Sequence, residues 1–121
     1  MENKHTLVLG ASDNPSRYSY LAVKRLRAKG YQVSAIGKRN TKVADVVIDT
    51  EKKDIKDVDT VSIYLNRENQ KEYYNYIISL KPRRIIFNPG AENPELSSLA
   101  EENNIRPMEA CTLVLLSTGQ Y

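Results

Sequence analysis

Short apolar runs alternate with amphipathic stretches along the whole chain. The runs have the length of β-strands, and the stretches between them place apolar residues three and four positions apart, as helices do. Such alternation is typical of parallel β-α-β construction. It predicts six strands, at residues 6–9, 31–36, 46–48, 61–65, 85–87 and 105–108.

The first predicted helix follows the first strand after a turn of small residues. Its apolar face consists of Tyr18, Leu21, Ala22 and Leu26, and Gly30 ends it. Glycine is common just past a helix because it adopts the left-handed conformation without strain. Arginine and lysine precede Gly30, where positive charge suits the last carbonyl groups.

Three further helical segments are predicted. One should span residues 67–80, with Asn66 as its N-cap. Asn93 and Pro94 are the N-cap and first residue of the next, and residues 112–117 form a closing helical turn. The residues that the 67–80 helix should bury are Tyr73, Ile77 and Leu80.

Right-handed crossovers would arrange these elements as one doubly wound parallel sheet, most simply in the order 3-2-1-4-5-6. The expected fold class is therefore α/β, a three-layer α/β/α sandwich with both faces of the sheet covered. Only a brief polar stretch separates the second predicted strand from the third, which leaves no room for a crossover helix there.

The first strand runs into Gly10, Ala11, Ser12, Asp13 and Asn14. In a doubly wound sheet, ligands lie beyond the carboxyl ends of the strands, where the strand order reverses between the first and fourth strands. Backbone N–H groups of such a turn and of the following helix can bind phosphate without a charged side chain. We therefore expect a nucleotide diphosphate here, and a purely structural turn is the alternative.

The second strand ends in Gly37, Lys38 and Arg39, with no acidic residue. NAD-binding proteins place Asp or Glu at this position for the ribose hydroxyls, whereas a phosphorylated ribose calls for a cation. The two cations argue against NAD and for a ribose with an extra phosphate, as in NADP or, at the 3′ position, coenzyme A. Alternatively, they belong to a solvated turn.

Composition narrows the class of protein further. The 121 residues fit one domain, residues 1–121, and no apolar run is long enough to cross a bilayer. The first five residues lack the apolar core of a secretory signal, so we expect a cytoplasmic location. The net charge of +3 is dispersed, and no aromatic platform for nucleic acid is evident. A single cysteine, Cys111, and a single histidine, His5, give no disulfide and no zinc site.

Candidate catalytic groups are few. Cys111 is the obvious nucleophile because a thiol near the start of a helix can be activated, but Glu109 close by would oppose the thiolate. A lone cysteine is most often a packed structural residue, which is the role we expect. Asp13 and Glu92 could act as acids or bases, yet neither has a partner at close spacing.

Four segments together resemble the small stand-alone CoA-binding domain proteins: GASDNP at 10–15, GYQV at 30–33, NPGAEN at 88–93 and EACTL at 109–113. Those proteins are similar in turn to the N-terminal domain of the succinyl-CoA synthetase alpha subunit and of ADP-forming acyl-CoA synthetases. The resemblance covers nearly the whole chain. This chain departs from it at the end of the second strand, where many relatives have a Val-Asn-Pro type sequence and more residues follow.

The resemblance implies a Rossmann-like CoA-binding fold and a set of binding residues. It places the first turn on the diphosphate and the basic segment after the second strand at the adenosine end. Two residues would edge the adenine pocket, and three would flank the pantetheine arm. In that order, the residues are Gly10, Ala11, Ser12, Asp13 and Asn14; Gly37, Lys38 and Arg39; Leu65 and Asn66; and Asn88, Pro89 and Gly90.

We therefore predict a protein that binds coenzyme A or an acyl-CoA and catalyses nothing by itself, because the phosphorylated histidine of the synthetases lies in a domain that this sequence does not contain. Two alternatives stay open. One is an NADP-binding oxidoreductase or its remnant, and the other is an interaction module that senses a nucleotide. A small-molecule ligand is the expected partner, and exposed edge strands are compatible with a homodimer.

Overall fold

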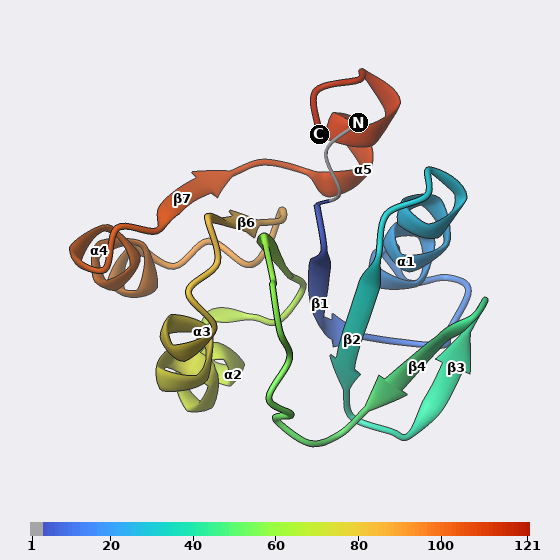
Figure 1. The fold of residues 1–121 in the computed structure, drawn as a ribbon, viewed down its shortest axis with the longest axis horizontal. Coiled ribbons are helices and arrows are strands. Elements are labelled where there is room, and N and C mark those ends of the chain that lie inside the picture. Colours follow the sequence, from blue (N-terminus) through green and yellow to red (C-terminus); the bar gives the residue numbers. More distant parts are fainter. Residues whose placement is uncertain (1–3) are drawn as a thin grey trace.

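A computed structural model describes residues 4–121 (Figure 1). Its strands are β1 (Thr6–Ala11), β2 (Val33–Gly37), β3 (Thr41–Val43), β4 (Val46–Asp49), β5 (Thr60–Ile63), β6 (Arg84–Phe87) and β7 (Arg106–Glu109). Its helices are α1 (Tyr18–Ala28), α2 (Arg67–Gln70), α3 (Tyr74–Leu80), α4 (Pro94–Glu102) and α5 (Thr112–Ser117), with a short 3-10 helix, η1 (Lys71–Tyr73), between α2 and α3.

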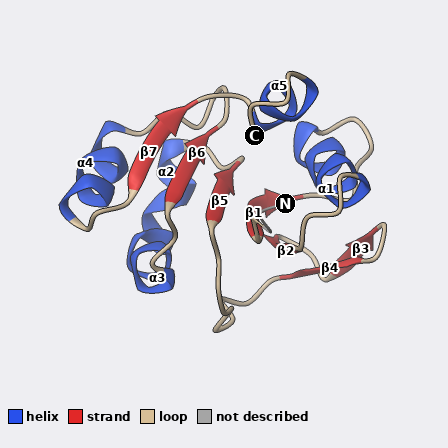
Figure 2. Ribbon diagram, turned by 45° about the horizontal axis from the view of Figure 1, so that its top comes forward, coloured by secondary structure: helices blue, strands red, loops and turns tan. Residues whose placement is uncertain are grey.

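The strands form one sheet in the order β3-β4-β2-β1-β5-β6-β7. All neighbours are parallel except β3 and β4. Figure 2 shows α1 and α5 on one side of the strands and α2 and α3 on the other. The predicted α/β class, the three layers and the order of the six predicted strands are therefore confirmed.

Alternation along the central strands divides the core between the two faces of the sheet. Leu7 and Leu9 of β1 pack with Ile77 of α3, whereas Val8, between them, packs with Val23 of α1. These side chains are fully buried, and burial of one such side chain contributes about 1.5–3 kcal/mol. The period-two pattern of β1 thus requires a helical layer on each face.

The hairpin of β3 and β4 was not predicted. Thr41–Val43 forms the outermost strand and pairs antiparallel with β4, which then lies parallel to β2. The intervening turn includes Ala44, whose φ of 54° is left-handed. β3 reverses the direction of the chain, so that β4 can run parallel to β2. This return takes fewer residues than a crossover helix would.

The single helix expected over residues 67–80 is wrong in detail. Asn66 caps its start as predicted, since its Oδ1 accepts a hydrogen bond from the Asn69 N–H at 2.8 Å. The helix is then interrupted by η1, which lies between two fully buried residues, Gln70 and Ile77. Tyr73 and Leu80, which the sequence also predicts to be buried, are only half-buried.

Three other expectations need correction. The second predicted strand, β2, begins at Val33, two residues later than predicted, and the fourth predicted strand, β5, ends at Ile63 rather than residue 65. Tyr18 is 72% exposed, because Ser19 takes the buried position in the first turn of α1. The side of β2 and β4 away from α1 has no helix over it: residues 50–59 form neither helix nor strand, and Val47 is exposed.

None of the helices between residues 4 and 121 has the length and apolar composition that crossing a bilayer requires.

Tyr121 fastens the segment after α5 to the sheet. Its ring is 6% exposed and lies 5.2 Å from the Tyr31 ring, centroid to centroid. The guanidinium carbon of Arg84 lies 4.4 Å from the Tyr121 ring centroid, and Arg84 Nη2 donates to the Tyr121 carbonyl oxygen at 2.9 Å. The Tyr121 hydroxyl hydrogen-bonds with Thr6.

We expect Tyr121→Ala to lower the free energy of unfolding by about 3 kcal/mol, because it leaves a cavity and removes the ring that covers buried Arg84. Equilibrium unfolding in urea measures the change. Gln120→Ala, at an exposed neighbour, is the control and should stay within about 0.5 kcal/mol of the parent protein. Equal midpoints for the two variants would contradict the anchoring role of Tyr121.

Candidate functional site

The structure brings the predicted site residues to the carboxyl ends of the parallel strands, called here the carboxyl edge of the sheet. Because β1, β2, β5, β6 and β7 are parallel, the segments that follow them all lie beyond the same edge. Together with the last residues of β1, β2 and β7, the segments are Gly10–Asn14, Gly37–Arg39, Leu65–Asn66, Asn88–Gly90 and Glu109–Cys111.

Gly10 marks a bulge at the end of β1, where the register with β2 shifts. Its φ of 88° is left-handed, and a Cβ there would lie 3.0 Å from Leu65 Cδ2 and 3.1 Å from the carbonyl carbon of Tyr64. The missing side chain therefore lets β1 pack closely against the end of β5. This packing is a sufficient reason for glycine at this position, whether or not a ligand approaches it.

The turn after β1 is organised by its own polar side chains. Ser12 Oγ accepts a hydrogen bond from the Asn14 N–H at 3.0 Å. Asn14 Oδ1 in turn accepts from the Ser16 N–H at 3.0 Å and from the Ser16 hydroxyl at 2.8 Å. These bonds fix the path of the chain into α1.

The start of α1 is uncapped within the described chain. Arg17 is the N-cap residue, its side chain accepts no hydrogen bond from the helix, and the first turn contains no acidic residue. The first N–H groups of a helix need an acceptor, and the positive end of the helix dipole favours an anion. This end of α1 can therefore bind a phosphate.

Gly37 brings the second loop against the first. A Cβ at Gly37 would collide with the Ala11 carbonyl oxygen and lie 3.0 Å from Ile48 Cγ2. The next residue, Lys38, is exposed and makes no hydrogen bond or ion pair within residues 4–121. Its charge is available to a ligand at this edge.

Arg39, by contrast, is engaged. Its Nη2 donates to Asp13 Oδ1 at 2.7 Å, and the Thr41 hydroxyl donates to Asp13 Oδ2 at 2.8 Å. The hydrogen bond from Thr41, and after it the neighbouring charge of Arg39, lower the pKa of Asp13 below its ordinary value. The Asp13 carboxylate is therefore ionised at neutral pH and links the turn after β1 to the segment after β2.

The Asn88 side chain is fully committed inside the protein. Its Nδ2 donates to Ser62 Oγ at 2.9 Å and to the Ile63 carbonyl oxygen at 3.0 Å, and its Oδ1 accepts from the Thr112 N–H at 2.8 Å. Asn88 thus ties β6 to β5 and to the start of α5. Pro89 and Gly90 are exposed beside it.

A buried amide pair connects the loops after β5 and β6. Gln70 Nε2 donates to the carbonyl oxygens of Leu65 at 2.9 Å and Ala91 at 2.7 Å, and Asn93 Nδ2 donates to Gln70 Oε1 at 2.9 Å. Sequence reasoning missed Gln70. The available signal was its position seven residues before Ile77, which places both on one helical face.

Cys111 and Tyr64 lie near the start of α5. Cys111 is half-buried and its side chain makes no capping hydrogen bond. The Tyr64 hydroxyl is buried without a hydrogen-bond partner among residues 4–121, and burial raises the pKa of Tyr64. His5 lies just before β1, at the opposite end of the strands, where its ring nitrogens hydrogen-bond with Ser34 Oγ and the Lys56 carbonyl oxygen.

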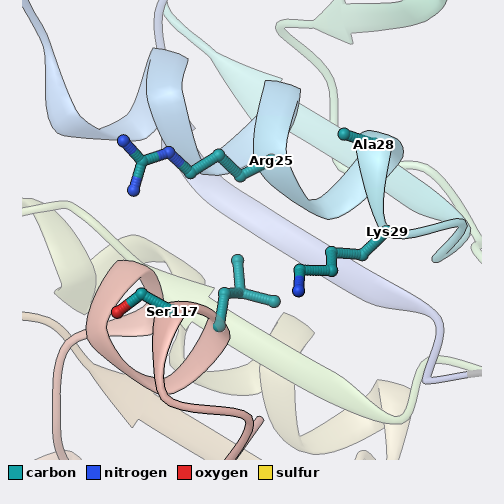
Figure 3. Close-up of a pocket in the computed structure, with 5 residues that line it drawn as sticks. Arg25, Ala28, Lys29 and Ser117 are labelled. Atoms are coloured by element: carbon teal, nitrogen blue, oxygen red, sulfur yellow. The ribbon is translucent and has the colours of Figure 1, made fainter.

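Two cavities lie away from these residues. One, of about 160 Å³, lies between α1 and α5 and is lined by Arg25, Ala28, Lys29, Leu116 and Ser117 (Figure 3). The other, of about 250 Å³, lies along β2 and β4 beneath residues 51–55. Both are smaller than a typical small-molecule pocket of roughly 300–1,000 Å³. No predicted site residue lines either cavity.

We expect Gly37→Ala to lower the free energy of unfolding by about 3 kcal/mol, because the new methyl group must push the end of β2 away from β1. Gly90→Ala is the control. Gly90 has a left-handed φ of 94° but no atom within 4 Å of a Cβ, so only backbone strain of about 1 kcal/mol applies. Urea unfolding distinguishes the two, and a smaller loss for Gly37→Ala would refute the steric argument.

Comparison with known proteins identifies the family and the fold. A family model for the CoA binding domain matches residues 4–117. Comparison with curated proteins gave no match. Among solved structures, the crystal structure of an uncharacterized protein is 46% identical over 100% of both chains, with a TM-score of 0.96.

Two more distant structures show the same fold. Cell-free ID.343 from Thermus thermophilus is 19% identical, with 98% of this chain and 91% of that chain covered and a TM-score of 0.86. The dinucleotide-forming acetyl-coenzyme A synthetase 1 of Ca. Korarchaeum cryptofilum, in complex with phosphate and ADP, is 18% identical with a TM-score of 0.70, covering 88% of this chain and 25% of that one. Since the family model spans nearly the whole chain, from β1 to the end of α5, this protein belongs to the CoA binding domain family.

Proposed function

We propose that this protein binds coenzyme A or an acyl-CoA across the carboxyl edge of its sheet and catalyses no reaction by itself. One observation carries the proposal: in a chain of the CoA binding domain family, the turn that leads to the uncapped start of α1 contacts the cationic segment after β2, through Asp13 and Arg39. A diphosphate fits the first feature, and a ribose phosphate fits the second.

The remaining loops supply surfaces for the rest of the ligand. Leu65, packed against Gly10, would border the adenine, and the Asn66 side chain keeps its amide nitrogen for it because only the oxygen caps α2. The pantetheine arm would pass Pro89 and Gly90, whereas the Asn88 side chain is fully used within the protein. Lys38, Asn66, Pro89 and Gly90 are exposed, so a long, flexible ligand would lie across an open surface rather than in a closed pocket.

The ionisable groups at this edge support binding rather than catalysis. Asp13 is held by Arg39 and Thr41, and the Glu92 carboxylate accepts from the Gly90 N–H at 3.1 Å. General acid–base catalysis needs a donor and an acceptor that can both reach the reacting atoms. His5 lies at the amino-terminal end of β1, away from the carboxyl ends of the strands, and can be neither the donor nor the acceptor there.

Coenzyme A should raise the melting temperature by roughly 10 °C at a free concentration of ~100 times its Kd, because it binds only the folded state. Dephospho-CoA, which lacks the 3′-phosphate, should stabilise less at the same concentration, and NAD should stabilise least. Thermal melting with each ligand, and with NADP, measures the order. No stabilisation by coenzyme A would refute the proposed function, and a larger effect of NADP would favour an oxidoreductase remnant.

Arg17→Asp tests the diphosphate position through opposite effects on stability and binding. Aspartate is a preferred N-cap, so the ligand-free protein should gain about 1 kcal/mol. The same carboxylate occupies the first N–H groups of α1 and repels a diphosphate, so the Kd for coenzyme A should rise about tenfold or more.

Arg17→Ala is the matched control, because it removes the cation without adding an acceptor. Its Kd should rise less than that of Arg17→Asp, as measured by isothermal titration calorimetry. Unchanged affinity in Arg17→Asp, together with increased stability, would place the diphosphate elsewhere.

A further inference from the structure

The segment after β2 presents two hydrogen-bond donors to one acceptor. Arg39 and Thr41 both donate to Asp13, through separate carboxylate oxygens, at 2.7 and 2.8 Å. A phosphate monoester presents the same arrangement, with two or more anionic oxygens that accept from a guanidinium and a hydroxyl. A ribose phosphate at this corner would therefore compete with an anion of the protein itself for Arg39 Nη2 and the Thr41 hydroxyl.

The pair is open to exchange with a ligand. The side chain of Arg39 is 74% exposed and that of Asp13 is 31% exposed. An exposed ion pair contributes only about 0.2–1 kcal/mol, so an incoming phosphate can displace the carboxylate. The displaced carboxylate stays nearby, because the turn after β1 is held by Ser12 and Asn14 and lies against the end of β2.

The cost of displacement depends on the charge that Asp13 carries. The carboxylate is ionised at neutral pH, as the lowered pKa indicates, and it would repel a phosphate that binds Arg39. The Lys38 side chain, three residues before Thr41, has no such internal partner within residues 4–121 and attracts every anionic ligand alike. The two cations after β2 are therefore not equivalent.

We propose that Asp13 is a specificity-determining residue that limits the preference of this site for a phosphorylated ribose, by competing with the ribose phosphate for Arg39 and Thr41. The inference rests on the proposed nucleotide site and adds to it. Arg39 Nη2 and the Thr41 hydroxyl can both bind the ligand only when Asp13 releases them, and the discrimination between phosphorylated and unphosphorylated ribose is smaller than the two cations alone would produce.

The test uses two pairs of ligands that differ only in the 3′-phosphate: coenzyme A with dephospho-CoA, and adenosine 3′,5′-bisphosphate with AMP. Asp13→Asn keeps the size of the side chain and removes its charge. Calorimetry at fixed low salt should show affinity for each 3′-phosphorylated ligand rising about threefold to tenfold, with the affinity for dephospho-CoA and AMP changed by less than about twofold.

Asp45→Asn is the matched control. Asp45 forms an equivalent exposed pair with Arg27, at 2.8 Å, and its loss changes the net charge by the same amount. It should leave all four affinities nearly unchanged, because Asp45 lies at the β3–β4 turn and does not contact the donors that bind Asp13. In the double variant Asp13→Asn, Arg39→Ala, the selective gain should disappear.

The outcomes separate this inference from the proposed function. If the parent protein binds coenzyme A but Asp13→Asn strengthens phosphorylated and unphosphorylated ligands equally, or weakens both, Asp13 does not set specificity and the binding function stands. An equal gain in Asp45→Asn would assign the effect to net charge and likewise refute the inference. If the parent protein binds neither coenzyme A nor adenosine 3′,5′-bisphosphate, both the function and the inference fail.

Discussion

The carboxyl end of β1 is packed against both neighbouring strands at positions that have no side chain. Gly10 lies against Tyr64 and Leu65 beyond β5, and Gly37 lies against the Ala11 carbonyl oxygen. These contacts bring the segments after β1, β2 and β5 to one place. The link between Asp13 and Arg39 depends on this close approach.

Under the proposed function, the carboxyl ends of the strands provide a binding surface without a deep pocket. Anion binding by a helix start needs only backbone N–H groups that lack other acceptors, and α1 provides these because Arg17 does not cap it. The side chains nearby either shape the loops, as Asn88 does, or adjust the charge, as Asp13 does. The backbone would thus bind the anion, while these side chains shape the loops and set the local charge.

The sequence predicted most of the architecture, because long-range order in such a sheet follows from local pattern. Apolar runs of strand length identified the six parallel strands, and their order followed from crossover handedness. The β3 strand escaped prediction because Thr41–Val43 contains a single apolar residue. The break between α2 and α3 escaped prediction because residues 67–80 contain no proline or glycine that would mark an interruption. The pairing of Asp13 with Arg39 spans 26 positions, and no local pattern indicates it.

The two sides of the rim are held by different kinds of bond. Between the loops after β5 and β6, Gln70 and Asn93 form buried hydrogen bonds between uncharged groups, which dissolved ions scarcely affect. Between the loops after β1 and β2, the tie is a solvent-exposed pair of opposite charges, which dissolved ions screen. Rising ionic strength therefore loosens the side expected to face the diphosphate and the ribose phosphate, while the side expected to border the adenine and the pantetheine arm keeps its shape.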